Sequence, residues 1–316
     1  MHLSSYSCNT NLLIHKKRLC EGKIIVKQCT RCSYETLYHF PSVFAAMFSK
    51  LSNKVQQSNL TERIPPGKLR SLFSIPFHIE RIKSELQDLV VLVDRIICIS
   101  EWYKKVLLLN DVPEEKITVV QPALTHEISH LGFPQEKESR LPIRFVFIGR
   151  LLPIKGIHTL IEAFREFQQE QVVLDIYGEF DDENYRERCL SMVQSNTVVH
   201  FKGKLSRNEV IPILKNYDMF CLASASSEMS PLVIQEAFAA GIPVLASRVY
   251  GNMEQVRSEE NGLLFEFDSV DSLRSKVKRL LSDPQILKNL KSNIVSPREF
   301  SLVVEDYLRI YESSSL

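Results

Sequence analysis

The chain has 316 residues, of which 44% are hydrophobic and 24% charged, and its formal net charge is +1. This composition is typical of a globular protein long enough to form two domains. The near-neutral charge gives no indication of a general affinity for nucleic acid or for anionic membranes, and no apolar run approaches the length of a membrane-spanning helix.

The opening residues, MHLSSYSCNT, lack the charged start and apolar block of a signal peptide. Seven cysteines without a secretion signal fit a reducing compartment better than a disulfide framework. We therefore expect a cytoplasmic location.

Four of the cysteines, Cys8, Cys20, Cys29 and Cys32, lie in the first tenth of the chain, and the last two form the pair CTRC. Four cysteines that include a C-x2-C pair have the ligand count of a structural zinc site. The alternative is a set of free thiols without a metal. The basic residues of this stretch either form a solvated face, offset thiolate charge or meet a phosphate-bearing acceptor.

The next part of the chain predicts helices over residues 43–51 and 77–93, which we interpret as packing elements. After them the pattern predicts a strand at 94–100, a helix at 101–110 and a strand at 116–123. We interpret this unit as the end of a first α/β domain. The polar, aperiodic residues 125–140 are predicted to form a linker.

From residue 141 onward, strands and helices alternate regularly. Such alternation predicts a doubly wound parallel sheet. The predicted strands are 144–149, 172–178, 198–203, 218–224, 243–247 and 261–267, and the predicted helices are 157–167, 184–194, 208–217, 231–241 and 269–283.

The stretch SSEMSPLVIQEAFAAGIPVLAS carries two acids, Glu228 and Glu236, in an otherwise apolar setting. Ser230 is predicted to cap the helix and Pro231 to be its first residue. Glu228 then lies in the loop at the carboxyl end of a strand, where parallel sheets bind ligands and a helix start favours an anion. The alternative is that Glu228 is solvated and Glu236 pairs with a neighbouring Lys or Arg.

A second motif, IGRLLPIKG, follows the strand 144–149. Gly149 lets the backbone turn, and Arg150 and Lys155 bring two cations to the same sheet edge as Glu228. A guanidinium and an ammonium together suit a diphosphate. Alone, the motif is equally consistent with two surface cations near a turn.

Together the segments GRLLPIKG, YGE, FKGKLSRNEV, EMSPLVIQEAFAAGIPVLAS and NGLLF resemble the retaining glycosyltransferases of sequence family four, over residues 85–316. The resemblance implies a GT-B fold of two Rossmann-like doubly wound domains, here with the first incomplete. It implies an acceptor-side domain in residues 1–125 with a Cys-rich start, a donor domain in 126–295, and a C-terminal helix in 296–316 that packs back on the first domain.

The same resemblance implies roles for single residues. Glu228 contacts the donor sugar and Glu236 takes the ribose hydroxyls. The remaining donor-binding set comprises Gly149, the diphosphate ligands Arg150 and Lys155, Gly203 and Leu205 near the base, and the phosphate cradle Ser230, Pro231 and Leu232. The donor is a nucleotide-diphosphate sugar, and no catalytic metal is expected.

Two departures from the family accompany the resemblance. Met229 and Ser230 stand where many relatives have Gly and an aromatic or other residue, and QPAL replaces the usual Asn-Gly after the last strand of the first domain. The strand and glycine-rich loop that open the first domain of the relatives have no counterpart. His2 corresponds to the acceptor-side histidine of the family, although it is equally consistent with a terminal residue without a role.

The expected function is transfer of a hexose-like sugar to a glycan or lipid-linked acceptor, as in cell-surface polysaccharide synthesis, with peripheral contact at the inner membrane face through the first domain. The main alternative is a catalytically impaired sugar-nucleotide-binding or regulatory protein. A phosphorylase or sugar epimerase shares the architecture. A zinc-stabilised interaction module would account for the cysteines alone.

Overall fold

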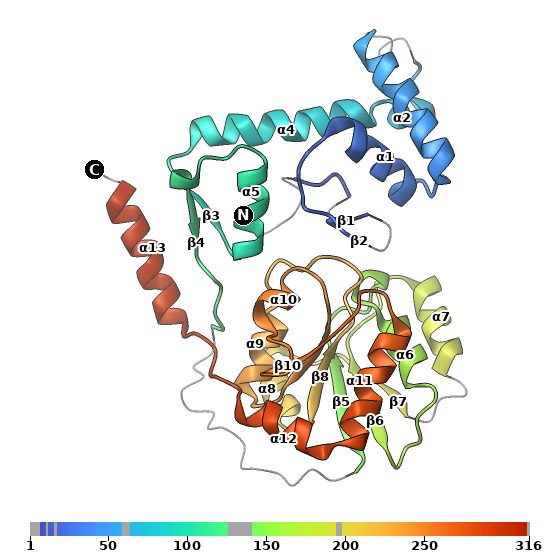
Figure 1. Cartoon of the computed structure of the whole chain (residues 1–316), viewed down its shortest axis with the longest axis vertical. Helices are drawn as coiled ribbons and strands as arrows, with labels where there is room; N and C mark the ends of the chain where they lie inside the picture. Colours follow the sequence, from blue (N-terminus) through green and yellow to red (C-terminus); the bar gives the residue numbers. More distant parts are fainter. Residues whose placement is uncertain are drawn as a thin grey trace. The chain divides into compact units, whose positions relative to one another are not determined.

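The computed structural model describes residues 7–10, 12–15, 18–58, 64–125, 141–193 and 198–314. The described chain divides into two compact units (Figure 1). The first comprises the residues up to Val120 together with those from Tyr311 onward, and the second is Gln121–Ile310.

The first unit is mainly helical. It contains a short antiparallel pair, β1–β2, and a parallel pair, β3–β4. Its elements are β1 (Ile14–His15), β2 (Arg18–Leu19), α1 (Val26–Leu37), α2 (Ser42–Gln57), α3 (Lys68–Phe73), α4 (Ile75–Leu92), β3 (Ile96–Cys98), α5 (Glu101–Leu109), a 3₁₀ turn (Glu114–Lys116) and β4 (Ile117–Val119).

Helix α1 was not apparent from the sequence, because the face that it buries is largely polar. Its buried residues are Thr30, Ser33 and Tyr34, and it packs against α2 and α4. Thr30 and Ser33 donate their hydroxyl hydrogens to backbone carbonyls four residues earlier in the helix. The buried face of this helix therefore holds few of the large apolar side chains by which such helices are usually recognised.

The second unit is a six-stranded parallel sheet with the strand order β10-β9-β8-β5-β6-β7. This is the order of a dinucleotide-binding doubly wound sheet, and it confirms the predicted fold class. The elements are β5 (Ile143–Ile148), a 3₁₀ turn (Pro153–Lys155), α6 (Ile157–Phe164), β6 (Val172–Tyr177), α7 (Glu183–Val193), β7 (Val199–Gly203), a 3₁₀ turn (Arg207–Glu209), α8 (Val210–Leu214), β8 (Met219–Leu222), α9 (Leu232–Ala239), β9 (Val244–Ser247), α10 (Asn252–Gln255), β10 (Gly262–Phe265), α11 (Val270–Ser282) and α12 (Pro284–Ser292). Helix α13 (Phe300–Ser314) begins in the second unit, and its residues from Tyr311 onward belong to the first.

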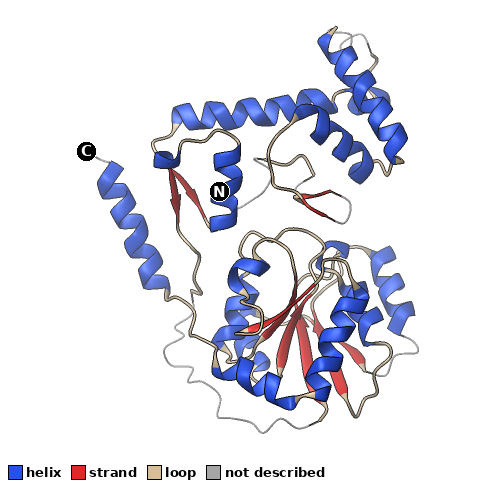
Figure 2. Ribbon diagram, viewed as in Figure 1, coloured by secondary structure: helices blue, strands red, loops and turns tan. Residues whose placement is uncertain are grey.

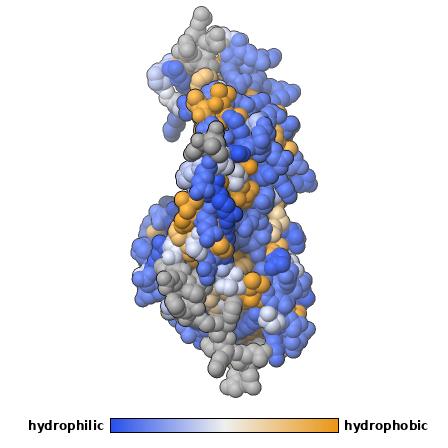
Figure 3. All heavy atoms as spheres, turned by 90° about the vertical axis from the view of Figure 1, so that its left-hand side faces the viewer, coloured by the Kyte–Doolittle hydropathy of each residue, from blue (hydrophilic) through white to orange (hydrophobic). Residues whose placement is uncertain are grey.

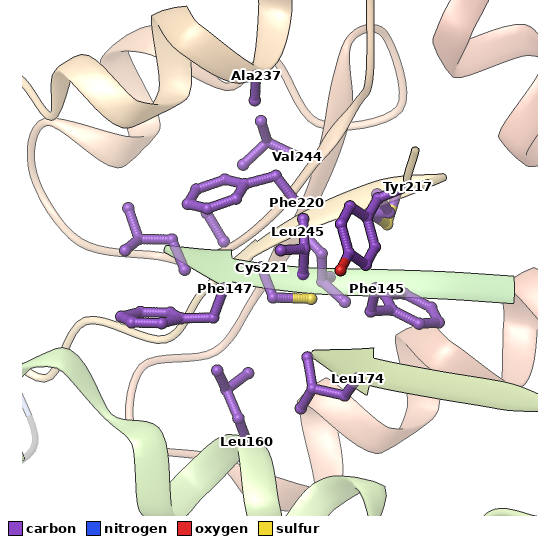
Figure 4. Close-up of a cluster of buried hydrophobic side chains, with 14 of the residues drawn as sticks. Phe145, Phe147, Leu160, Leu174, Tyr217, Phe220, Cys221, Ala237, Val244 and Leu245 are labelled. Carbon is purple, nitrogen blue, oxygen red and sulfur yellow. The ribbon is translucent and has the colours of Figure 1, made fainter. Parts of the chain in front are cut away.

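The hydrophobic core of the second unit surrounds its central strands. Strands β8 and β9 are buried along their whole length, because helices cover both faces of the sheet (Figure 2). Figure 4 shows Phe147, Leu160 and Phe220 among the side chains that meet there. Helix α6 packs against α7 and α11, and α8 packs against α9. The sheet and its helices thus form a rigid base for the loops at the strand ends.

The surface in the view of Figure 3 is mainly hydrophilic, and its hydrophobic residues occur in small separate groups. Helix α13 contributes exposed apolar residues, with exposed fractions of 45% for Phe300 and 54% for Leu308. Among the described residues, no helix combines the length and the apolar character that crossing a membrane requires.

Candidate functional site

The candidate site lies at the carboxyl ends of β5 and β8, which are neighbours in the centre of the sheet. The chain continues from β5 to β6 on one side and from β8 to β9 on the other. The crevice between two such strand ends is where open parallel sheets bind ligands. The loops that follow β5 and β8 carry both sequence motifs.

These two loops are held in direct contact. The N–H of Ala225 donates to the carbonyl of Ile154 at 2.7 Å. Gly156 has a φ of 69°, and a Cβ atom at this position would lie 1.9 Å from the carbonyl oxygen of Ala223. Only glycine permits both the left-handed backbone and the close approach.

The contact between the loops joins two predicted site residues. Nζ of Lys155 lies 2.6 Å from Oε1 of Glu228, and the Ser224 hydroxyl donates to the same oxygen at 2.6 Å. The side chain of Lys155 is 22% exposed and that of Glu228 is 14% exposed. Glu228 is therefore not solvated, as the alternative interpretation held, but is partly buried and held by two donors.

A third loop, which follows β9, positions the backbone of Glu228. The N–H of Glu228 donates to the carbonyl of Tyr250 at 2.9 Å. At the next residue, Gly251, a Cβ atom would lie 2.1 Å from the carbonyl oxygen of Glu228. The glycine permits this close packing, and a side chain there would displace Glu228.

Helix α9 begins one residue later than predicted. Pro231 is the N-cap and Leu232 the first helical residue, so the assignment of Ser230 as the cap was wrong. The side chain of Ser230 makes no capping hydrogen bond and instead accepts from Nε2 of Gln255 at 3.4 Å. Because Pro231 adopts an extended ψ of 112°, the helix starts after it.

Glu236 lies in the second turn of α9 and is half-buried. Within the part of the chain that the structure describes, its carboxylate has no hydrogen-bond or ion-pair partner. Burial raises the pKa of Glu236 above its ordinary value of 4.5, and the charge of Arg207 partly opposes this rise. The alternative of a direct ion pair is therefore wrong, and the carboxylate is available to accept hydrogen bonds from a ligand.

The two predicted cations have different partners. Whereas Lys155 pairs with Glu228, the guanidinium of Arg150 lies 3.8 Å from Asp181, in the loop after β6. The side chain of Arg150 is 71% exposed. Both residues follow β5, as predicted, but in the structure each forms an ion pair with a different carboxylate.

The remaining predicted residues of this set follow β5 and β7. Gly149, directly after β5, has a φ of 153°, and its N–H donates to the carbonyl of Tyr177 at 3.1 Å. Gly203 ends β7 with a φ of 79°, and its carbonyl accepts from the N–H of Gly178 at 2.8 Å. Leu205 is half-buried and packs against the core. These residues lie at the same carboxyl edge of the sheet as Glu228.

Other predicted residues lie elsewhere. The four cysteines Cys8, Cys20, Cys29 and Cys32 line a pocket in the first unit. His2 lies outside the described residues.

Sequence reasoning missed Ser224, Gly251 and Gln255, which position the predicted residues. Ser224 follows β8, which ends at Leu222, and the other two residues follow β9, which ends at Ser247. A glycine in the segment VYGN, just after a strand, is the one signal that pointed to a close backbone approach.

Comparison with known proteins agrees with this architecture. Residues 133–295 match the family model described as "Glycosyl transferases group 1". The chain is similar to an uncharacterized glycosyltransferase of Methanocaldococcus jannaschii, with 24% identity over 69% of this chain and 58% of that protein. It is 28% identical to the UDP-Gal:alpha-D-GlcNAc-diphosphoundecaprenol alpha-1,3-galactosyltransferase of Escherichia coli, over 64% of this chain and 54% of that enzyme.

Among solved structures, the chain resembles HepE of Anabaena in complex with UDP and glucose, with a TM-score of 0.61 and 21% identity. The match covers 74% of this chain and 67% of HepE. At this identity the similarity shows the fold. The chain thus spans between half and two thirds of the length of these curated relatives.

Proposed function

Because the chain belongs to the group 1 glycosyl transferases, we propose that it transfers a sugar from a nucleotide-diphosphate donor to a glycan or lipid-linked acceptor, with retention of anomeric configuration. The observation that carries the proposal is the arrangement at the carboxyl ends of β5 and β8. One carboxylate, Glu228, is paired with a cation there, and a second, Glu236 of the following helix α9, is half-buried without a partner among the described residues.

The Lys155–Glu228 pair gives the ligand-free site a balanced charge. When a donor binds, the ammonium of Lys155 turns toward the diphosphate, and Glu228 becomes free to accept hydrogen bonds from the sugar hydroxyls. Ser224 keeps the carboxylate in place during this exchange, because its hydroxyl already donates to Oε1. Arg150, which is mostly exposed, adds a second cation to the diphosphate.

Glu236 is assigned to the ribose of the donor. An ionised carboxylate can accept hydrogen bonds from two neighbouring hydroxyl groups. The absence of a protein partner among the described residues leaves both oxygens of Glu236 available for such a diol. The carboxylate thereby regains the hydrogen bonds that a half-buried charge requires.

The chemistry is the exchange of one bond at the anomeric carbon. The bond to the diphosphate oxygen breaks, and a bond to the acceptor oxygen forms on the same face. The departing diphosphate takes the proton of the acceptor hydroxyl, so that the products are a glycoside and a nucleoside diphosphate. Cations beside the diphosphate stabilise the charge that develops on it, commonly the largest electrostatic contribution to such a reaction.

The acceptor is proposed to be a glycan or a lipid diphosphate-linked sugar. The Escherichia coli relative is named for a diphosphoundecaprenol-linked acceptor. A lipid-linked acceptor requires that the enzyme approach a membrane surface, so we include peripheral membrane contact and a role in polysaccharide synthesis in the proposal.

The test is steady-state kinetics with a panel of nucleotide-diphosphate sugars, combined with calorimetric donor binding. Glu228→Gln should lower transfer by on the order of a hundredfold, because it misplaces the reacting sugar, and should change donor affinity little. Glu236→Ala should mainly weaken donor binding. Product analysis by NMR decides between retention and inversion.

Glu166→Gln is the matched control, because Glu166 pairs with Lys278 beyond the end of α6, away from the loops that follow β5 and β8. This variant should behave like the wild type. If Glu228→Gln and Glu236→Ala both changed only KM, the division of roles would be wrong. Donor binding without transfer to any acceptor would favour the alternative, a sugar-nucleotide-binding protein without transferase activity.

A further inference from the structure

Four cysteines that are far apart in the sequence line one pocket of the first unit. The pocket has a volume of about 110 Å³, and Cys8, Cys20, Cys29 and Cys32 all contribute to its wall. Cys8 precedes and Cys20 follows the β1–β2 hairpin, and the other two lie on α1 (Figure 1). A spacing of three residues places Cys29 and Cys32 on the same side of that helix.

The other three cysteines of the chain have a different environment from the four in the pocket. Cys98, Cys189 and Cys221 are buried and belong to the hydrophobic cores, where a free cysteine acts as a small apolar side chain. The four cysteines of the pocket are only partly buried. They therefore do not serve as core-filling residues.

We propose that Cys8, Cys20, Cys29 and Cys32 together bind one structural zinc ion. Four thiolates suit the tetrahedral coordination that zinc prefers, and a set of four protein ligands leaves no position open for substrate. Each thiol loses its proton when it binds the metal. The site therefore stabilises the first unit and takes no part in the transfer reaction.

The charge and hydrogen bonding around the pocket fit this assignment. A zinc ion with four thiolates carries a net charge of −2, and the basic residues Lys23, Lys27 and Arg31 lie in the same segment. In the structure, Cys8 Sγ lies 3.2 Å from the Thr10 hydroxyl, and Cys32 Sγ lies 3.8 Å from the Thr36 hydroxyl. These are weak hydrogen bonds that a metal ion readily replaces.

As placed, no three His, Cys, Asp or Glu side chains among the described residues are close enough together to share an ion. Binding therefore requires the thiols to turn from their present hydrogen-bond partners into the pocket. The β1–β2 hairpin, whose strands have two residues each, is short enough to move with them. A pair of strands this short has little stability of its own, which gives the metal a structural role.

His15 also lines the pocket, but the structure assigns it another partner. Its Nε2 lies 2.5 Å from Oε2 of Glu35, and Glu35 also accepts from Arg31. A histidine held in this way does not replace one of the four cysteines. It provides a control within the same pocket.

The test is the zinc content of the full-length chain, purified without a polyhistidine tag and without chelator. We expect about one zinc per chain, with zinc X-ray absorption that shows four sulfur ligands at about 2.3 Å. Replacement of the zinc by cobalt(II) should produce the visible ligand-field bands of a tetrahedral thiolate site. These measurements use the wild-type protein, so they do not depend on whether a variant folds.

Single Cys→Ser changes at positions 8, 20, 29 and 32 should each lower the zinc content and the protease resistance of the first unit. His15→Ala and Cys98→Ala are the controls and should retain the metal. Protein that holds no zinc and takes none up from a zinc buffer would overturn the proposal. Iron in place of zinc, disulfides among the four cysteines, or full retention of zinc by the Cys29→Ser and Cys32→Ser variants would also overturn it. None of these results depends on transferase activity.

Discussion

Two helices, one from each unit of the protein, bury different kinds of residue. Helix α9 of the second unit buries Ile234, Phe238 and neighbouring alanines, as amphipathic helices usually do. Helix α2 of the first unit buries Ala45, Ser49 and Ser52. Several of its large apolar residues face outward, with exposed fractions of 79% for Val43 and 55% for Met47, whereas Phe48 packs against the rings of Tyr34 and Phe40.

Both units have apolar cores. The hydrophobic cluster of the second unit includes residues between Leu124 and Ile294 and contains the central strands. The first unit buries apolar residues such as Ile79 and Tyr103, and in addition small residues of α2 allow close helix contacts and polar side chains bond to backbone groups. For example, the Ser49 hydroxyl donates to the carbonyl of Lys27 at 3.1 Å. The predictions below test whether the two units depend on these different interactions.

The largest effect is expected for Gly156→Ala, in the second unit. The new Cβ atom would lie 1.9 Å from the carbonyl oxygen of Ala223, and the residue has a φ of 69°. We expect a loss of more than about 3 kcal/mol in the free energy of unfolding, because both strain and a backbone clash contribute. Limited proteolysis at increasing urea concentrations, with the fragments assigned to each unit, should show that the second unit is the one that loses stability.

Gly203→Ala is the matched control for that change. Gly203 also has a positive φ, of 79°, but a Cβ atom there would meet no atom within 4 Å. Only the conformational cost of about 1 to 2 kcal/mol should remain. Equal losses for the two variants would show that the loops after β5 and β8 can separate, contrary to the close contact described above.

In the first unit, the corresponding weak point is a polar residue. The buried side chain of Asn110 accepts from the N–H of Ile24 at 2.8 Å and donates to the carbonyls of Gly22 and Val106. Asn110→Ala leaves these groups without partners, and we expect a loss of about 2 to 3 kcal/mol. The exposed Asn289, changed to alanine, is the control. A loss below about 0.5 kcal/mol for Asn110→Ala would contradict a contribution of these polar contacts to the stability of the unit.

Donor binding should depend on the second unit's loops. Arg150→Ala and Lys155→Ala should each weaken binding of a nucleotide-diphosphate sugar by about 1.5 to 3 kcal/mol, the usual value of a hydrogen bond to a charged group. Binding of the nucleoside alone should change little. The control Lys278→Ala removes a cation that pairs with Glu166 beyond the end of α6. Unchanged calorimetric affinity in both site variants would remove the diphosphate assignment.

The raised pKa of Glu236 predicts how donor binding varies with pH. Burial is the main cause of the rise, so protonation begins at a higher pH than for an exposed glutamate. Only the ionised carboxylate accepts both ribose hydrogen bonds. Donor affinity should therefore fall as the pH is lowered through this raised pKa, by at most about tenfold per pH unit.

Glu236→Gln should remove that pH dependence. It should not lower the stability of the free protein at neutral pH, because burial penalises the charged side chain that it replaces. An unchanged pH profile in the variant would show that another group is responsible.

The smallest effect is expected for Met47→Ser on the exposed face of α2. Because Met47 is 55% exposed, the change should alter the free energy of unfolding by less than about 0.5 kcal/mol. Ile79→Ala, at a residue of α4 that is 1% exposed, should cost about 2 to 5 kcal/mol. A large loss from Met47→Ser would show that the apolar face of α2 packs more closely than its exposure indicates.

Much of the second unit could be predicted, because its signals are local. Its six strands and five of its helices occur in the predicted order, each within a few residues of the expected bounds, whereas α10 and α12 were not predicted. Helix α1 could not be predicted, because Thr30 and Ser33 on its buried face carry no hydrophobic pattern. The start of α9 was misplaced by one residue because Ser230 resembles a cap in sequence, whereas Pro231 ends the extended segment.

The sequence alone determined that Arg150, Lys155 and Glu228 share one edge of a parallel sheet, because strand ends and the loops after them follow from local periodicity. Only the tertiary structure decided which of them meet. Lys155 pairs with Glu228, 73 residues further along the chain, and Arg150 turns instead toward Asp181. The close approach at Gly251 and the pocket shared by four cysteines likewise depend on contacts between distant segments, which no local pattern encodes.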